Sequence, residues 1–288
     1  MYSLLLAIVS SASVAVVLKC FRNQRGNRFG IILGNYLTCI AVSLVLMPDR
    51  SMVMTGSGVT LLCGGLGGVL FVAGLVSMQS SVSANGATLT AAFAKLGLLV
   101  PLALSILWFG ERPGLHQIGG ILLALAAVMV IHTGRRGGEG DPADRGAAPS
   151  LALLLLTLLA CGSSDGMAKV FEQLGRRSED VLYFFYVFLT AAVLSVILAA
   201  AEYRKTGKRI LLTELAAGVA VGIPNYFSSY LLLKALITLP AFLVYPVFST
   251  GTILLVMAVS AAFFRERPGR RQLAGIGLVL AALVLLNL

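Results

Sequence analysis

Ten long runs of apolar residues alternate with short polar connections along the chain. The runs cover residues 2–18, 29–47, 58–79, 83–109, 115–132, 149–168, 181–201, 211–236, 239–264 and 271–287. A helix needs about 20 predominantly apolar residues to cross the hydrocarbon core of a bilayer. The pattern therefore predicts an all-α integral membrane protein with ten transmembrane helices.

The runs form two groups of five, in residues 1–134 and 149–288. Between them, residues 135–148 are rich in Gly, Pro and charge, have little to bury, and are predicted to form a mobile linker. Short connections at 80–83 and 238–240 occupy matching places in the two groups. Because five is odd, the second group enters the membrane upside down relative to the first, which predicts two inverted five-helix repeats.

A charged sequence motif occurs twice in the chain, at an offset of 155 residues. Residues 109–120 read FGERPGLHQIGG and residues 264–275 read FRERPGRRQLAG, with seven of twelve positions identical. Pro113 and Pro268 suit the first turn of a helix, where a missing N–H is not needed. Glu111 and Glu266 would lie just before the positive end of that helix, where a carboxylate is favoured. We therefore expect these four residues to be structural turn residues.

These features together resemble a known transporter family. Two five-helix halves, each with an apolar–Glu–Arg–Pro turn and a Gln–x–x–Gly helix start, are similar to the ten-helix EamA-type branch of the drug/metabolite transporter superfamily. The resemblance implies alternating-access transport of a small metabolite through a central cavity between the halves. It leaves the substrate open, because relatives export amino acids and others carry nucleotide-sugars, choline or drugs.

Composition and charge agree with a bilayer environment. Hydrophobic residues make up 58% of the chain, charged residues 12%, and the mean hydropathy is +0.93, which leaves too little polar surface for a soluble protein. The net charge of +10 does not indicate nucleic-acid binding, because Lys and Arg gather in the short connections. Connections after odd-numbered runs hold 15 of these cations and the others hold 5. The positive-inside rule then predicts a multi-pass protein of the cell (plasma or inner) membrane with both termini outside.

Chemistry that would require a metal, a cofactor or a catalytic nucleophile is not expected. The four cysteines are far apart in the chain and show no CxxC spacing, so neither a metal site nor a disulfide framework is indicated. No HExxH motif is present, which argues against a zinc hydrolase of the membrane.

Lys95 is the strongest candidate for a substrate ligand, because a cation in the middle of an apolar run is costly and therefore functional by default. Asn85, Thr88, Ala92 and Lys95 follow one another at helical spacing and would share one face that lines a cavity. The ammonium of Lys95 would bind a carboxylate or phosphate of the substrate. The alternative is a buried ion pair with Asp165.

Asp165 lies in a polar stretch of the sixth run and could bind a coupling proton or cation. Lys169 follows four residues later on the same predicted helix and could pair with it locally. Six further side chains within apolar runs are expected to contact substrate: Asn225, Tyr226 and Ser229 in the eighth run, and Tyr245, Ser249 and Thr250 in the ninth, where Thr250 aligns with Lys95 under the offset of the duplicated motif.

The sequence therefore predicts a secondary transporter, with an amino acid or another small anionic or zwitterionic solute favoured. A carrier of cationic drugs or quaternary amines, and a lipid flippase on the same fold, stay open as alternatives. The expected partners are the substrate, the lipid bilayer and a coupling proton or cation, with no nucleic acid. The chain is expected to act as a monomer or homodimer.

Overall fold

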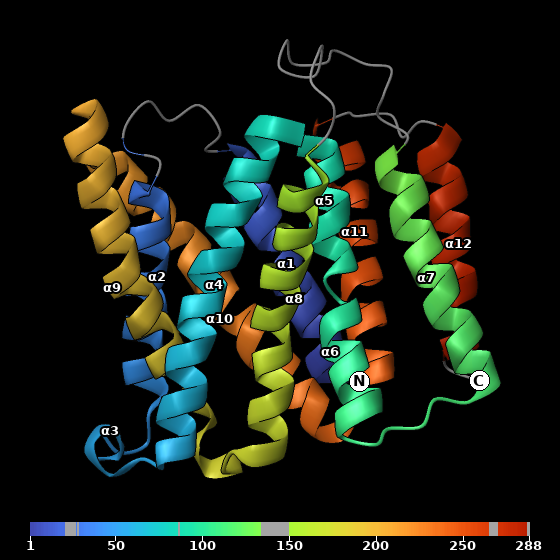
Figure 1. The fold of residues 1–288 in the computed structure, drawn as a ribbon, viewed down its shortest axis with the longest axis horizontal. Helices are drawn as coiled ribbons and strands as arrows, with labels where there is room; N and C mark the ends of the chain where they lie inside the picture. The colour runs from blue at the N-terminus through green and yellow to red at the C-terminus, as the bar shows by residue number, and fades with distance from the viewer. Residues whose placement is uncertain (21–26, 28, 86, 134–149, 265–269, 287–288) are drawn as a thin grey trace. The chain divides into compact units, whose positions relative to one another are not determined.

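The computed structural model describes residues 1–288 except 21–26, 28, 86, 134–149, 265–269 and 287–288 (Figure 1). The long helices are α1 (Tyr2–Cys20), α2 (Gly30–Leu46), α4 (Gly58–Asn85), α7 (Leu115–Thr133), α8 (Leu151–Leu174), α9 (Asp180–Thr206), α10 (Leu212–Thr238), α11 (Ala241–Phe264) and α12 (Arg270–Leu286). The short elements are α3 (Met52–Thr55), α5 (Ala87–Leu96), α6 (Leu99–Ala103), the π-helix η1 (Leu104–Trp108) and the 3-10 helix η3 (Arg177–Glu179).

All ten predicted apolar runs correspond to helical segments of the described chain. Six stretches are long and apolar enough to cross a membrane: Gly58–Asn85, Leu89–Trp108, Leu151–Leu174, Arg177–Thr206, Leu212–Thr238 and Ala241–Val259. Four shorter apolar helices occupy the remaining runs: Tyr2–Leu18, Gly30–Leu46, Leu115–Val130 and Leu273–Leu286. The prediction of an all-α membrane architecture is therefore confirmed.

The third and fourth runs differ in detail from the prediction. The expected polar turn at 80–83 is helical and belongs to α4, because its serines hydrogen-bond back to the helix: Ser80 Oγ donates to the Val76 carbonyl at 2.9 Å and Ser83 Oγ to the Gln79 carbonyl at 3.1 Å. The fourth run is not one helix but three consecutive pieces, α5, α6 and η1. The break between α5 and α6 includes Gly97, and glycine is unfavourable in the interior of a helix.

The helices assemble into two compact units, each taking parts from both halves of the chain. Unit 1 consists of Met1–Val72 and Val170–Ala235, and unit 2 of Ala73–Lys169 and Leu236–Leu288. Helices α4, α8 and α10 therefore continue from one unit into the other. The predicted division at 135–148 rests on the sequence repeat, and the inverted relation of the two repeats stays a prediction.

Unit 1 has an aromatic core. The rings of Tyr226 and Tyr230 stack at 5.9 Å between centroids, and Phe188 lies 6.0 Å from Tyr226 and 6.2 Å from Tyr36. Helices α2 and α9 lie side by side at the edge of this unit (Figure 1). Aromatic pairs in these geometries add to the free energy gained from burial alone.

Unit 2 is built around helices α7 and α12, which run side by side (Figure 1). Gly120 of α7 allows the close approach, because a Cβ there would lie 2.8 Å from Cγ of Leu286 and 3.1 Å from the carbonyl oxygen of Ala282. Small and branched side chains, among them Ala127, Val128 and Val279, fill the core between α7, α11 and α12. Small residues at such contacts are typical of membrane helix packing.

Two neighbouring glycines of α4 test this packing within unit 1. A Cβ at Gly64 would lie 2.5 Å from Cβ of Tyr186 and 3.0 Å from the Tyr183 carbonyl, whereas a Cβ at Gly65 meets nothing within 4 Å. Gly64→Ala should therefore lower the free energy of unfolding by about 1–3 kcal/mol. Gly65→Ala should be neutral or raise it by up to about 1 kcal/mol, since alanine favours the helix. Thermal unfolding in detergent measures both, and equal shifts would contradict the packing.

Candidate functional site

A glycine-rich turn of α8 brings the predicted charged residues of unit 2 together. A Cβ at Gly162 would overlap the carbonyl oxygen of Gly97, and a Cβ at Gly166 would lie 3.0 Å from Leu104. Backbone can approach this closely only where side chains are absent. The stretch 162–166 of α8 therefore lies directly against the chain between α5 and η1, which places Asp165 near Lys95.

Lys95 and Asp165 form the charged centre of this site. Lys95 lies in the last turn of α5, and its charge interacts with that of Asp165 on α8. Lys95 is partly exposed, and Asp165 is exposed although it lies within an apolar span. A carboxylate facing lipid there would be strongly disfavoured. We therefore expect the exposed side chain of Asp165 to face water within the span, and not lipid.

Helix α11 adds polar groups to the same unit. The hydroxyl of Tyr245 donates to the backbone carbonyl of Asp165 at 2.9 Å, which links α11 to α8. Thr250 Oγ1 donates to the Pro246 carbonyl at 2.6 Å and is occupied within its own helix. The Ser249 hydroxyl is buried and has no hydrogen-bond partner among the described residues. Since a buried hydroxyl needs a partner, Ser249 is suited to bind a ligand.

Glu111 occupies a second charged cluster of unit 2. Lys169 Nζ, which is 2% exposed, lies 2.9 Å from Glu111 Oε1. The backbone N–H groups of Ala241 and Phe242 donate to Glu111 Oε2 at 2.9 and 3.4 Å. These are the first residues of α11, so the carboxylate caps that helix from a distant loop. Burial opposes ionisation of Glu111, but the hydrogen bonds from Lys169 and Ala241 together hold its pKa below its usual range.

This geometry corrects three predictions from the sequence. Lys169 pairs with Glu111 and does not pair locally with Asp165, because α8 directs it toward the loop before α7. Glu111 stabilises the positive end of α11, whereas the sequence suggested the helix that follows it directly, α7. Pro113 precedes α7 instead of lying in its first turn, since that helix begins at Leu115.

Asn85 does not share a helix face with Lys95. It is the last residue of α4, and its side chain accepts a hydrogen bond from the Ser150 N–H at 2.6 Å, just before α8 begins. Ala92, expected on the same cavity-lining face, is fully buried. The side chain of Thr88 lies outside the described residues, as do Glu266 and Pro268.

The predicted residues of the eighth run belong to unit 1. Tyr226 is fully buried in the aromatic core, and Asn225 Nδ2 lies 3.8 Å from Cys39 Sγ as a weak donor. Ser229 is partly exposed. These three residues therefore belong to unit 1, whereas Lys95 belongs to unit 2.

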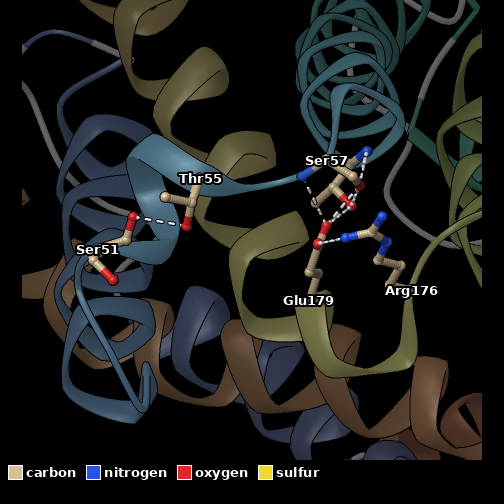
Figure 2. A network of polar contacts seen from close by, with 6 residues as sticks. Ser51, Thr55, Ser57, Arg176 and Glu179 are labelled. Carbon is tan, nitrogen blue, oxygen red and sulfur yellow. Dashed lines mark hydrogen bonds and ion pairs between the residues drawn. The ribbon is translucent and has the colours of Figure 1, made fainter.

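The sequence interpretation missed a polar network at one end of unit 1 (Figure 2). Glu179 is 5% exposed, accepts the Ser57 hydroxyl at 2.6 Å and the Ser57 N–H at 3.2 Å, and is also bonded by Thr60. Arg176 lies 3.6 Å from the other carboxylate oxygen. Figure 2 shows the carboxylate directed at the start of α4. An acidic residue just before an apolar run was the available signal, but the sequence does not show which helix it would cap.

A second ion pair in unit 1 was also missed. Lys234 Nζ contacts the carboxylate of Asp180, and the same ammonium lies 5.2 Å from the centroid of the Tyr230 ring. Neither Lys234 nor Asp180 was among the residues predicted from the sequence. Across the described residues, no group of three or more His, Cys, Asp or Glu side chains is placed to hold a metal ion.

Known proteins resemble this chain in sequence and in fold. Residues 150–288 match the profile of the EamA-like transporter family. An uncharacterized protein of Haemophilus influenzae strain Rd is 24% identical over 294 aligned residues, which cover 98% of this chain and 96% of that protein. A solved crystal structure superimposes with a TM-score of 0.74 at 17% sequence identity, covering 99% of this chain and 94% of the other. At that identity the match shows a shared fold over nearly the whole chain.

Proposed function

Because its second half, residues 150–288, belongs to the EamA-like transporter family, we propose that this protein moves a small anionic or zwitterionic metabolite across the membrane. The protein is a multi-pass membrane transporter of the drug/metabolite type. An amino acid is the favoured substrate, and transport proceeds by alternating access without enzymatic chemistry.

The observation that carries the proposal is the pair of opposite charges in unit 2. Lys95 and Asp165 lie near enough for their charges to interact, and Lys95 is partly and Asp165 well exposed, inside spans that are otherwise apolar. An amino acid carries a carboxylate and an ammonium a few ångströms apart, so it can bind both side chains at once. Lys95 would bind the carboxylate, Asp165 the ammonium, and Ser249 would donate to or accept from the substrate.

Asp165 is also the residue proposed to couple transport to a proton or cation. When no substrate is bound, its charge is partly balanced by Lys95. When the substrate is an anion without an ammonium group, its carboxylate would engage Lys95, remove that balance and favour uptake of a positive charge by Asp165. The carboxyl would then carry a proton or cation together with the substrate.

The experiment that tests the proposal is a thermal-shift screen of the detergent-purified protein against metabolites sorted by charge, with Lys95→Ala in parallel. A ligand that binds the native state stabilises it, by about 2.7 kcal/mol at a hundred times its dissociation constant. Stabilisation of wild type alone by anionic or zwitterionic compounds supports the proposal. Stabilisation of both proteins by cations would overturn it and favour a carrier of cationic drugs or quaternary amines that uses Asp165.

The positive-inside count leads us to propose that both termini lie outside the cytoplasm. A fluorescent protein that matures only in the cytoplasm should therefore be dark when fused to the C-terminus, whereas alkaline phosphatase fused at the same point should be active. A fluorescent C-terminal fusion would reverse the assignment.

A further inference from the structure

The end of helix α9 carries a cavity that the transport site does not use. The cavity has a volume of about 370 Å³ and belongs entirely to unit 1. Its lining includes the apolar side chains of Leu33, Val196 and Ile210. Three exposed residues, Tyr203, Lys208 and Arg209, also line the cavity and are called its rim here. Apolar side chains next to two exposed cations suit an amphiphile with a negatively charged head group.

The rim is held in place by the protein itself. Asn27 is 1% exposed, and its side-chain amide donates to the carbonyls of Ala199 at 3.0 Å and Lys208 at 3.3 Å. Gly207 adopts the left-handed conformation, with φ at 69°, and its N–H donates to the Tyr203 carbonyl at 2.8 Å. This closes α9 and turns the chain back. Lys208 and Arg209 are therefore held beside the cavity in a fixed connection.

An apolar stripe on α9 leads along the helix to this rim. Leu189, Val193 and Val196 are 38%, 53% and 52% exposed, and they precede the exposed Ala200 and Tyr203 at alternating spacings of three and four. These spacings place the side chains on one helix face. In a bilayer this face lies against lipid tails, and its aromatic residue lies at the level of the head groups.

Positive charges near the rim outnumber the negative charges that pair with them. Arg204, Lys205, Lys208 and Arg209 are all exposed, and within the described part of the chain none of them forms an ion pair. Cations near a helix C-terminus are favoured by the helix dipole, and cations in loops by membrane topology. Neither effect explains why Lys208 and Arg209 line a cavity together with apolar side chains of the lipid-facing stripe.

We propose that this cavity, named here the α9 rim site, binds an anionic phospholipid. The phosphate accepts hydrogen bonds from Lys208, Arg209 and the Tyr203 hydroxyl, and an acyl chain follows the stripe from Val196 toward Leu189. Basic pockets at the cytoplasmic surface bind anionic head groups in this way. The site is independent of the proposed transport function.

Native mass spectrometry of the detergent-purified full chain, titrated with phosphatidylglycerol, tests the proposal. Lys208→Ala with Arg209→Ala should weaken binding about 30-fold, since each cation near a head group contributes about 1 kcal/mol. Arg204→Ala with Lys205→Ala is the matched control, because it removes the same charge from residues that do not line the cavity, and it should bind nearly as wild type. Phosphatidylcholine should bind weakly to all three proteins.

A third variant separates the cavity from the charge. Ala200→Trp keeps every cation but fills the apolar part, and it should lose phosphatidylglycerol binding while its thermal unfolding stays near that of wild type. Equal weakening by the two charge variants would overturn the proposal in favour of diffuse electrostatic attraction. Full binding by Ala200→Trp, or full competition by glycerol phosphate or inorganic phosphate, would also overturn it.

Discussion

Replacing Glu111 with alanine should lower the free energy of unfolding by about 3–5 kcal/mol, because it removes the carboxylate that forms an ion pair with a buried ammonium. Lys169 is 2% exposed, and its ammonium lies 2.9 Å from the Glu111 carboxylate. The same substitution removes the acceptor for the N–H groups of Ala241 and Phe242 at the start of α11. Chemical or thermal unfolding in detergent measures the loss.

A double-mutant cycle isolates the ion pair from the helix cap. Glu111→Ala combined with Lys169→Met should recover much of the lost stability, since neither charge then remains buried. Glu172→Ala, one turn from Lys169 on α8 and hydrogen-bonded to Gln173, is the matched carboxylate control and should change stability little. A double variant no more stable than Glu111→Ala would show that the cap, and not the charge pair, dominates.

The ion pair also predicts an acid limit to stability. Burial opposes ionisation of Glu111, yet hydrogen bonds from Lys169 and Ala241 hold its pKa below the usual value near 4.3. A carboxyl with a lowered pKa in the folded state contributes stability that is fully present above its unfolded pKa. That stability is lost as the pH falls through the folded pKa. Below about pH 4 the wild type should lose stability more steeply than Glu111→Ala.

Replacing Lys95 with alanine should reduce transport about 100-fold, because removal of one member of a charged contact typically costs 2–5 kcal/mol of binding. The protein should remain folded, since the carboxylate left behind, Asp165, is exposed and can be hydrated. Uptake into proteoliposomes measures the effect, with the compound that stabilises the wild type in the thermal-shift screen as substrate.

Two further variants make this result specific. Lys205→Ala removes an exposed lysine at the end of α9 and should transport at the wild-type rate. Lys95→Arg keeps the charge and should retain part of the activity, although the guanidinium presents a different geometry. Uptake at the wild-type rate by Lys95→Ala would remove the basis for assigning the substrate charge.

The helices and their membrane character could be predicted from the sequence, because apolar length alone decides both. Partners across the fold could not. Lys169 has a carboxylate four residues before it, and local spacing favoured that pairing. The observed partner, Glu111, lies 58 positions away in the chain. Helix spacing gives no information on contacts between segments that tertiary packing brings together.

The positions of breaks within helices could not be predicted from the sequence either. Ser80 and Ser83 were interpreted as a turn because serine is common in turns, but their hydroxyls bond back to α4. The same helix then ends at Asn85, which removes that residue from the face of Lys95. Conversely, the irregular stretch from Gly97 to Trp108 was predicted as continuous helix, because an apolar run carries no signal for a π-helix.

The interleaved composition of the two units has a consequence for biosynthesis. Unit 1 needs residues up to Ala235, and unit 2 needs helices α11 and α12 as well. Since the ribosome delivers the chain from its N-terminus, α1 and α2 enter the membrane long before α9 and α10, their companions in unit 1, are synthesised. The early helices must therefore be retained by lipid or by the insertion machinery until then. A ribosome that stops before α9 leaves both units unfinished, with Gly34 of α2 and Gly64 and Gly68 of α4 uncovered.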